Sequence, residues 1–267
     1  MRNRTYIQDI IFAIEEVAPL HWQESYDNAG LIIGDVNKEC SGVLICLDVF
    51  ASTVRQAVEK KCNLIISHHP FIFHGIKKLE HGSQITNILT LAIKNDIAVY
   101  SAHTNMDSSL IGVNAVLGEK LFLGNISPLD NERYSSETNF LGSGAVGVLE
   151  QECRAEDYLQ KVKKSLNLYS IRYAGNTEKK IKKVGYCGGS GSFLIDAAIQ
   201  KGCDMFLTGD LKYHDFLSCE DKIIIADIGH FESEQFIKQR FFDIISKKIC
   251  NFAPLYITKE ENRVKFL

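Results

Sequence analysis

The sequence contains no long hydrophobic run. No apolar stretch approaches the roughly 20 residues that a membrane-spanning helix needs, and Glu15 and Glu16 interrupt the amino-terminal segment. The apolar residues of that segment recur at helical spacing, which predicts an amphipathic helix near residues 7–17 and not a secretory signal. We therefore expect a cytoplasmic protein that has no membrane partner.

The sequence also has little excess charge of either sign. Its formal net charge is −3 over 267 residues, which gives no general attraction to nucleic acid or to anionic membranes. None of the eight cysteines forms a C-x-x-C pair, and most of them lie in apolar runs. Reduced thiols in the core are therefore predicted, with disulfides or a zinc–thiolate site as the alternative.

Prolines are few, four in the chain, and short apolar strands alternate with helical patterns. This alternation predicts an α/β fold, with helices packed on mostly parallel or mixed sheets. A polar, irregular stretch at 124–142 is predicted to be a surface connection, so we expect two intertwined α/β halves, 1–123 and 124–267. The predicted strands are 30–35, 42–48, 63–67, 97–102, 144–149, 168–173, 182–187, 203–208, 222–227 and 254–258; the predicted helices between them include 51–61, 83–95, 108–121, 155–166, 192–201 and 232–248.

The two halves carry a faint internal repeat. Residues 43–69 align with 184–210 without a gap, with five identities in 27 positions, and the strand–helix–strand pattern coincides. The next strands also align, so that His103 matches His230 and Asp107 matches Glu234. Either two ordinary α/β units look alike here, or the chain is an old duplication whose halves face one site.

Four of the eight histidines follow predicted strands at matched places. His68 and His69 end one strand, while His103 and His230 follow the next strand in each half. Ligands bind outside the carboxyl ends of parallel strands, and imidazole together with carboxylate binds Zn, Fe, Ni, Co and Mn. Because Glu234 lies four residues after His230, both can reach one ion from a helix. The other four histidines, His21, His74, His81 and His214, have no matched partner and are interpreted as structural or peripheral.

These residues lie in motifs that resemble the NIF-three-like family, whose members are often described as GTP cyclohydrolase 1 type 2 homologues. The resemblance covers nearly the whole chain, in family order, except that Tyr26 stands where the family usually has Trp. It rests on "ESYDNAGLIIGD" (24–35), "ISHHPFIFHGIKKL" (66–79), "SAHTNMDSSLIGVNAVL" (101–117), "GYCGGSGSFL" (185–194), "CDMFLTGDLKYHD" (203–215) and "DIGHFESE" (227–234).

The resemblance implies a dinuclear metal site with His68, His69, Asp107, His230 and Glu234 as ligands and His103 beside them. It also implies a homohexamer built as a trimer of dimers. No extra domain is inserted mid-chain, because the connection after residue 120 is too short for one.

The ligand set predicts metal-assisted hydrolysis by two divalent ions, which lower the pKa of a bound water so that hydroxide becomes the nucleophile. With GTP, the substrate that the resemblance implies, hydroxide attacks the purine ring and formate leaves. His103 is predicted to shuttle the proton or, alternatively, to orient a ligand. The glycine-rich 187–191 segment is either a phosphate-binding turn or a plain tight turn.

Two other functions fit the same ligands. The chain can be a metal-binding scaffold or regulatory interaction protein, or a dinuclear phosphoesterase or amidase. Release of formate from GTP distinguishes the first prediction from both.

Overall fold

The computed structural model describes residues 4–130, 139–219, 222–249 and 254–267. The chain forms two compact units, which are described separately. Unit 1 comprises Met1–Met106 and Ile237–Glu261, and unit 2 comprises Asp107–Phe236 and Asn262–Leu267. The chain passes between the units three times. The first crossing lies at 106/107, whereas the halves predicted from sequence divide at 123/124.

Unit 1 is built on a five-stranded sheet in the order β1-β4-β3-β2-β11. The four strands from β4 to β11 are parallel, and β1 is antiparallel to β4. The carboxyl ends of β2, β3 and β4 therefore meet at one edge, where β1 begins. The strands are β1 Gly30–Ile33, β2 Val43–Cys46, β3 Leu64–Ser67, β4 Ala98–Ser101 and β11 Leu255–Ile257.

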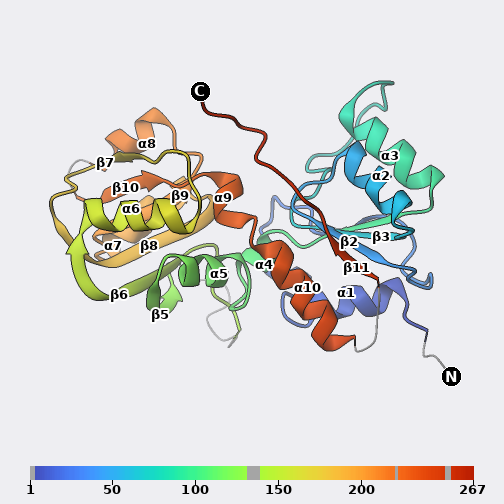
Figure 1. The fold of residues 1–267 in the computed structure, drawn as a ribbon, viewed down its shortest axis with the longest axis horizontal. Coiled ribbons are helices and arrows are strands. Elements are labelled where there is room, and N and C mark those ends of the chain that lie inside the picture. The colour runs from blue at the N-terminus through green and yellow to red at the C-terminus, as the bar shows by residue number, and fades with distance from the viewer. Residues whose placement is uncertain (1–3, 131–138, 220–221, 250–253) are drawn as a thin grey trace. The chain divides into compact units, whose positions relative to one another are not determined.

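Helices cover both faces of this sheet (Figure 1). Helices α2 (Ala51–Glu59) and α3 (Gln84–Lys94) pack on one face in a single apolar cluster with β2, β3 and β4. Helices α1 (Ile7–Glu15) and α10 (Ile237–Lys248) contact each other, and α10 also contacts β2 and β11. Strands buried on both faces read as continuous apolar runs, as "VLIC" and "LIIS" do.

Unit 2 is built on a six-stranded mixed sheet in the order β5-β6-β8-β9-β10-β7. Strands β8, β9 and β10 are parallel, and the remaining pairings are antiparallel. The strands are β5 Leu123–Pro128, β6 Ala145–Arg154, β7 Arg172–Ala174, β8 Lys180–Ser190, β9 Met205–Gly209 and β10 Ile224–Asp227.

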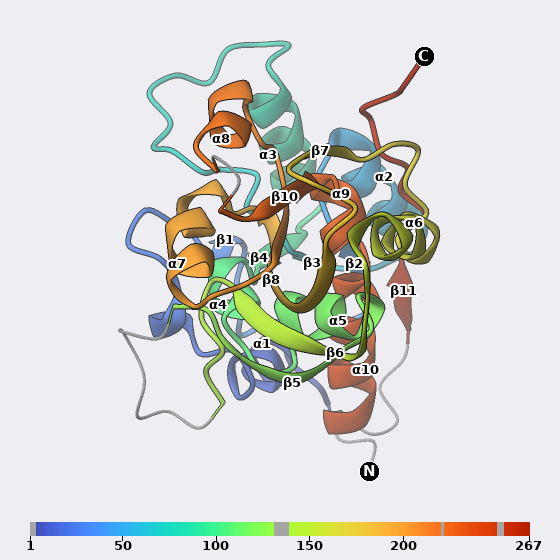
Figure 2. The ribbon, with the colours of Figure 1, turned by 90° about the vertical axis from the view of Figure 1, so that its left-hand side faces the viewer.

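Alternate residues of the central strands pack into two apolar clusters, one on each face of the sheet. Met205 and Leu207 pack with α5 (Val113–Lys120) and α6 (Ala155–Ser165), whereas Phe206 packs with α7 (Ile195–Gln200). Helix α8 (Tyr213–Leu217) contributes Phe216 to the second cluster. Figure 2 shows α7 and α8 on one side of this sheet and α6 on the other. The sheet therefore has a buried core on each face.

The two units share one strand register. Val43 pairs with Leu64 in unit 1, and their aligned counterparts Val184 and Met205 pair in unit 2. The match continues to the last strand, where Ser101 and Asp227 occupy equivalent positions. His230 then follows its strand one residue later than His103 does, so the loop holds one extra residue. This common register supports the predicted duplication.

Three local expectations are wrong. Residues 123–128 form the edge strand β5, although 124–142 was expected to be irregular. Strand β8 runs on to Ser190, so the glycine-rich segment is part of a strand for most of its length. The helix expected at 232–248 is two helices, α9 (His230–Glu234) and α10. Residues 131–138 of the expected connection lie outside the described residues.

Seven cysteines of the described chain are free thiols, and six of these seven are buried. This confirms the prediction of reduced core thiols at the six buried positions; Cys153 is only partly buried, and Cys250 lies outside the described residues. Among the described residues, no helix is both long and apolar enough to cross a membrane.

Candidate metal centre

Unit 1 gathers three imidazole rings at the carboxyl edge of its sheet. His68 and His69 directly follow β3, and His103 lies two residues after β4. One ring nitrogen from each of the three lies within 4.8 Å of the others. Ring centroids are 4.9 Å apart for His68–His69, 5.3 Å for His68–His103 and 5.5 Å for His69–His103. We call this group the three-histidine cluster.

Each ring of the three-histidine cluster is held through its Nδ1 atom. His68 Nδ1 lies 2.9 Å from the carbonyl oxygen of Ala102. His69 Nδ1 lies 2.9 Å from Asp48 Oδ1, and His103 Nδ1 lies 2.8 Å from Asp27 Oδ1. Because these oxygens accept hydrogen bonds, each Nδ1 carries a proton, and Nε2 is the ring nitrogen that can bind a metal. Histidines that bind metals in proteins are commonly held in this way.

Asp27 is a fully buried carboxylate with several donors. Besides His103, it accepts hydrogen bonds from the backbone N–H of Thr104 at 3.0 Å and from the Thr104 hydroxyl. Burial alone would raise the pKa of Asp27, but these donors outweigh it and lower the pKa to about 2. Asp27 is therefore charged at neutral pH and fixes the orientation of His103.

Unit 2 places a histidine and a glutamate one helical turn apart. His230 begins α9 and Glu234 ends it, and His230 Nε2 lies 3.1 Å from Glu234 Oε2. His230 Nδ1 lies 2.7 Å from Asp210 Oδ2. Burial would lower the pKa of His230, yet Glu234 and Asp210 outweigh it and raise the pKa to about 11. The imidazolium proton on Nε2 thus occupies the place that a cation would take between these two side chains.

The glycine-rich strand end makes room for this pair. Gly189 has φ +62°, and a Cβ atom there would lie 3.1 Å from Glu234 Cδ and 3.2 Å from His230 Nε2, with Oε1 closer still. Its N–H donates to Ser233 Oγ, and the N–H of Gly188 donates to Asn114 Oδ1. Since these N–H groups are engaged within the protein, they do not form the phosphate cradle considered from the sequence.

Asp107 places another carboxylate close to Glu234 in unit 2. One of its carboxylate oxygens lies within 4.8 Å of one from Glu234, and Asn114 Nδ2 donates to its carbonyl oxygen at 3.2 Å. Burial raises the pKa of the nearby Cys187 thiol, and Asp107 and Glu234 raise it further. Cys187 is therefore a neutral thiol that packs beside the carboxylates.

The Asp227 carboxylate stabilises the turn that carries His230. Asp227 accepts hydrogen bonds from the backbone N–H groups of Leu211 at 3.2 Å and Gly229 at 3.0 Å, and it pairs with Arg172. Leu211 follows Asp210, and Gly229, with φ +77°, precedes His230. The Arg172–Asp227 pair thus fixes both ends of the Asp210–His230 hydrogen bond.

The sequence predicted the histidines but not the carboxylates that hold them. Asp27, Asp48 and Asp210 were not considered as site residues. A usable signal was present, because Asp48 and Asp210 lie within two residues of the carboxyl ends of β2 and β9, where site residues gather. The four histidines interpreted as structural or peripheral are all exposed; they are His21, His74, His81 and His214.

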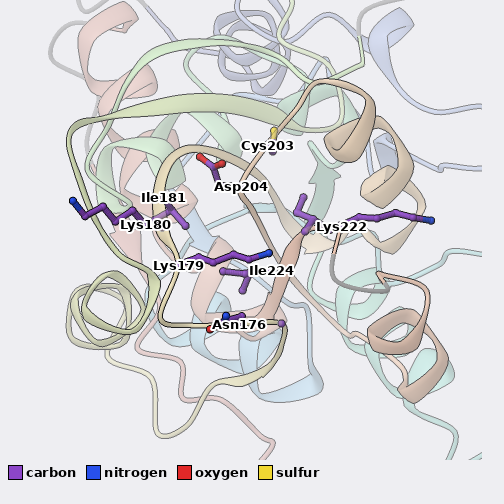
Figure 3. A pocket seen from close by; sticks show the side chains of 10 residues that line it. Asn176, Lys179, Lys180, Ile181, Cys203, Asp204, Lys222 and Ile224 are labelled. Atoms are coloured by element: carbon purple, nitrogen blue, oxygen red, sulfur yellow. The ribbon is translucent and has the colours of Figure 1, made fainter.

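A separate hollow lies at the opposite, amino end of the unit 2 strands. It offers about 110 Å³ and is lined by Asn176, Lys179, Lys180, Asp204, Lys222 and four apolar side chains among others. Figure 3 shows the Lys180 and Lys222 side chains pointing away in opposite directions. Asp204 accepts hydrogen bonds from the backbone N–H groups of Lys182 and Lys183. With no histidine in its lining, this hollow has none of the ligands of the metal centre.

Comparison with known proteins gives a consistent set of relatives. Residues 5–262 match the model of the family described as Duf34/NIF3 (NGG1p interacting factor 3). A Clostridium perfringens protein named GTP cyclohydrolase 1 type 2 homolog is 34% identical over 256 residues, which cover 95% of this chain and 96% of that one.

Solved structures show the same fold. A hypothetical protein from Staphylococcus aureus superimposes with a TM-score of 0.87 at 28% identity, covering 99% of this chain and 100% of the other. Reduced HcgD from Methanocaldococcus jannaschii superimposes with a TM-score of 0.79 at 25% identity, covering 95% and 98%.

Proposed function

Because the chain belongs to the Duf34/NIF3 family, we propose that it is a metal-dependent hydrolase. Its two divalent ions are bound by His68, His69, Asp107, His230 and Glu234. The ions belong to the group Zn, Fe, Mn, Ni and Co, which imidazole and carboxylate ligands accept.

One observation carries this proposal. Each of the four strand-end histidines has its Nδ1 atom beside an oxygen acceptor, at 2.7–2.9 Å. A structural histidine needs no such uniform arrangement, whereas a metal ligand must present Nε2 in a fixed direction. The fit to a cation is also chemical, because the buried Glu234 and the partly buried Asp107 bring two negative charges close together, and carboxylate oxygens bind divalent ions.

We propose a purine nucleoside triphosphate, GTP, as the substrate. The relatives named GTP cyclohydrolase 1 type 2 homolog support this choice. Bound ions of this kind supply an activated water for attack on a polarised carbon. Hydrolytic opening of the guanine imidazole ring consumes one water and gives a formamide, and a second water hydrolyses this formamide to release formate.

His103 is proposed to move the proton in this reaction. Asp27 holds its Nδ1–H, which leaves Nε2 to accept a proton from water and return it to the leaving group. A buried carboxylate behind an imidazole also stabilises the imidazolium that forms. Asp27 is thus a positioning residue for His103.

Formate release tests the proposal. Purified, metal-loaded protein is incubated with GTP, and formate is measured with formate dehydrogenase, with Glu234→Gln protein as the control. Formate from the wild type and none from the variant supports the proposal. Release of phosphate without formate identifies a phosphoesterase, and release of neither favours the metal-binding scaffold.

Two further predictions accompany this function. We propose a homohexamer, since closed symmetric assemblies dominate among soluble homomers, and light scattering tests it. The cytoplasmic location expected from the sequence stays a prediction.

A further inference from the structure

Two exposed aromatic rings extend the three-histidine cluster outward. The Phe73 ring centroid lies 6.1 Å from that of His103 at an interplanar angle of 82°. The Tyr26 ring lies 6.3 Å from Phe73 at 49°. Tyr26 is 59% exposed and Phe73 is 37% exposed, so both offer ring surface beside a polar site. We call this pair the aromatic wall.

The aromatic wall is held in place from within. Tyr26 precedes Asp27, whose carboxylate binds His103 and Thr104. Asn28 Nδ2 donates to the carbonyl oxygen of Ile72 at 2.7 Å, and Ile72 precedes Phe73. The residues next to each ring are therefore hydrogen-bonded to the histidine site or to one another. Rings that are already held by such tethered segments lose little conformational freedom when a ligand stacks on them.

We infer that the aromatic wall of Tyr26 and Phe73 stacks the planar base of the substrate beside His103. This inference rests on the proposed function and specifies its substrate as one with a fused aromatic ring. A purine has two polarisable faces, and base–aromatic stacking tolerates different rings. The contiguous rings of Tyr26, Phe73 and His103 give the base a path from the surface to the histidines.

The charges near the wall suit the rest of a nucleotide. Lys77 and Lys78 follow Phe73 on the same exposed segment, with His74 and His81 beside them in sequence. Flexible lysines bind phosphates as point charges. The wall therefore accounts for recognition of the base, and the segment 74–81 carries cations for the phosphates.

Equilibrium binding of GTP tests the inference with Tyr26→Ala protein. Removing one stacking partner weakens binding of a base by about 5- to 150-fold. Tyr26→Phe and Tyr26→Trp keep a ring and are expected to bind GTP within about threefold of wild type. The matched control is Tyr169→Ala, because Tyr169 is also exposed but stacks on Phe266 in unit 2.

Inorganic tripolyphosphate separates the base from the phosphates. Its affinity is expected to be equal for wild type and Tyr26→Ala, while UTP, with a smaller base, binds more weakly than GTP. Measurements on as-purified and on EDTA-treated protein are compared, so that a change in metal content is not mistaken for lost stacking. The same fold-change in both preparations supports the inference.

Several results overturn it. They are undiminished GTP binding by Tyr26→Ala, equal loss in Tyr169→Ala, an equal loss of tripolyphosphate affinity, or no binding of GTP to the wild type. Tyr26-dependent GTP binding without formate release refutes the proposed reaction and leaves the stacking site standing. Formate release that Tyr26→Ala leaves unchanged refutes the stacking site and leaves the proposed reaction standing.

Discussion

Gly189→Ala is expected to expel metal from the unit 2 ligands without unfolding the protein. The new Cβ would lie 3.1 Å from Glu234 Cδ and 3.2 Å from His230 Nε2, with the carboxylate Oε1 inside contact distance. The carboxylate must therefore move, and metal–ligand distances tolerate deviations of only about 0.2 Å. We expect affinity for the metal to fall by at least about 10- to 100-fold, the loss typical of disturbing one supporting contact.

A matched control isolates this effect from backbone strain. Gly202 has φ +67°, close to the +62° of Gly189, but a Cβ there meets nothing within 4 Å. Both substitutions should lower the free energy of unfolding by about 1–2 kcal/mol, the cost of a left-handed alanine. Only Gly189→Ala should lose metal.

Competition with a chromogenic chelator measures metal affinity, and urea denaturation of EDTA-treated protein measures stability. Wild-type affinity in Gly189→Ala would refute the placement of Glu234 as a ligand. Equal loss of metal in Gly202→Ala would show that strain, and not the carboxylate, governs binding.

Three other predictions concern the carboxylates and the pH. Asp210→Asn removes the charge behind His230 but keeps a residue type that tolerates φ +57°. Metal affinity should therefore fall about tenfold. The control Asp196→Asn changes an exposed carboxylate and should leave metal affinity unchanged in the same chelator assay. Because the pKa of His230 is raised to about 11 in the metal-free protein, a proton must leave His230 when a metal ion binds. The apparent affinity for the metal should therefore rise about tenfold per pH unit from pH 7 to pH 9. Glu234→Gln should flatten this dependence on pH. The pKa of Asp27 is lowered from 3.8 to about 2, so its contribution of about 2 kcal/mol is present above pH 4 and is lost as the pH falls through 2. Urea denaturation should therefore show the gap between wild type and Asp27→Asn closing between pH 5 and pH 2, and a constant gap would contradict this role.

The sequence was sufficient for the strand-end histidines because two regular patterns coincide there. Apolar runs predict buried strands, and polar residues after such runs lie at one edge of a parallel sheet. His68, His69 and His103 could be grouped on that basis. The four-residue spacing of His230 and Glu234 predicted that both lie on one face of a helix.

The supporting carboxylates depend on geometry that the local pattern does not encode. Asp27 reaches His103 across 76 positions of sequence, because β1 is antiparallel to β4 and begins where β4 ends. The role of Gly189 needed the position of α9 over the end of β8. The break between α9 and α10 was missed because apolar periodicity continues across it, although the chain passes there from unit 2 to unit 1.

Anomalous X-ray scattering from crystals of the as-purified protein tests the proposed metal centre most directly. Two peaks are expected, roughly 3.5–4 Å apart as in other two-metal sites, with His68, His69, Asp107, His230 and Glu234 as their protein ligands. The absorption edge identifies the element. Peaks bound only to exposed histidines such as His21 or His214, or no peak in protein whose elemental analysis shows bound metal, would contradict the account.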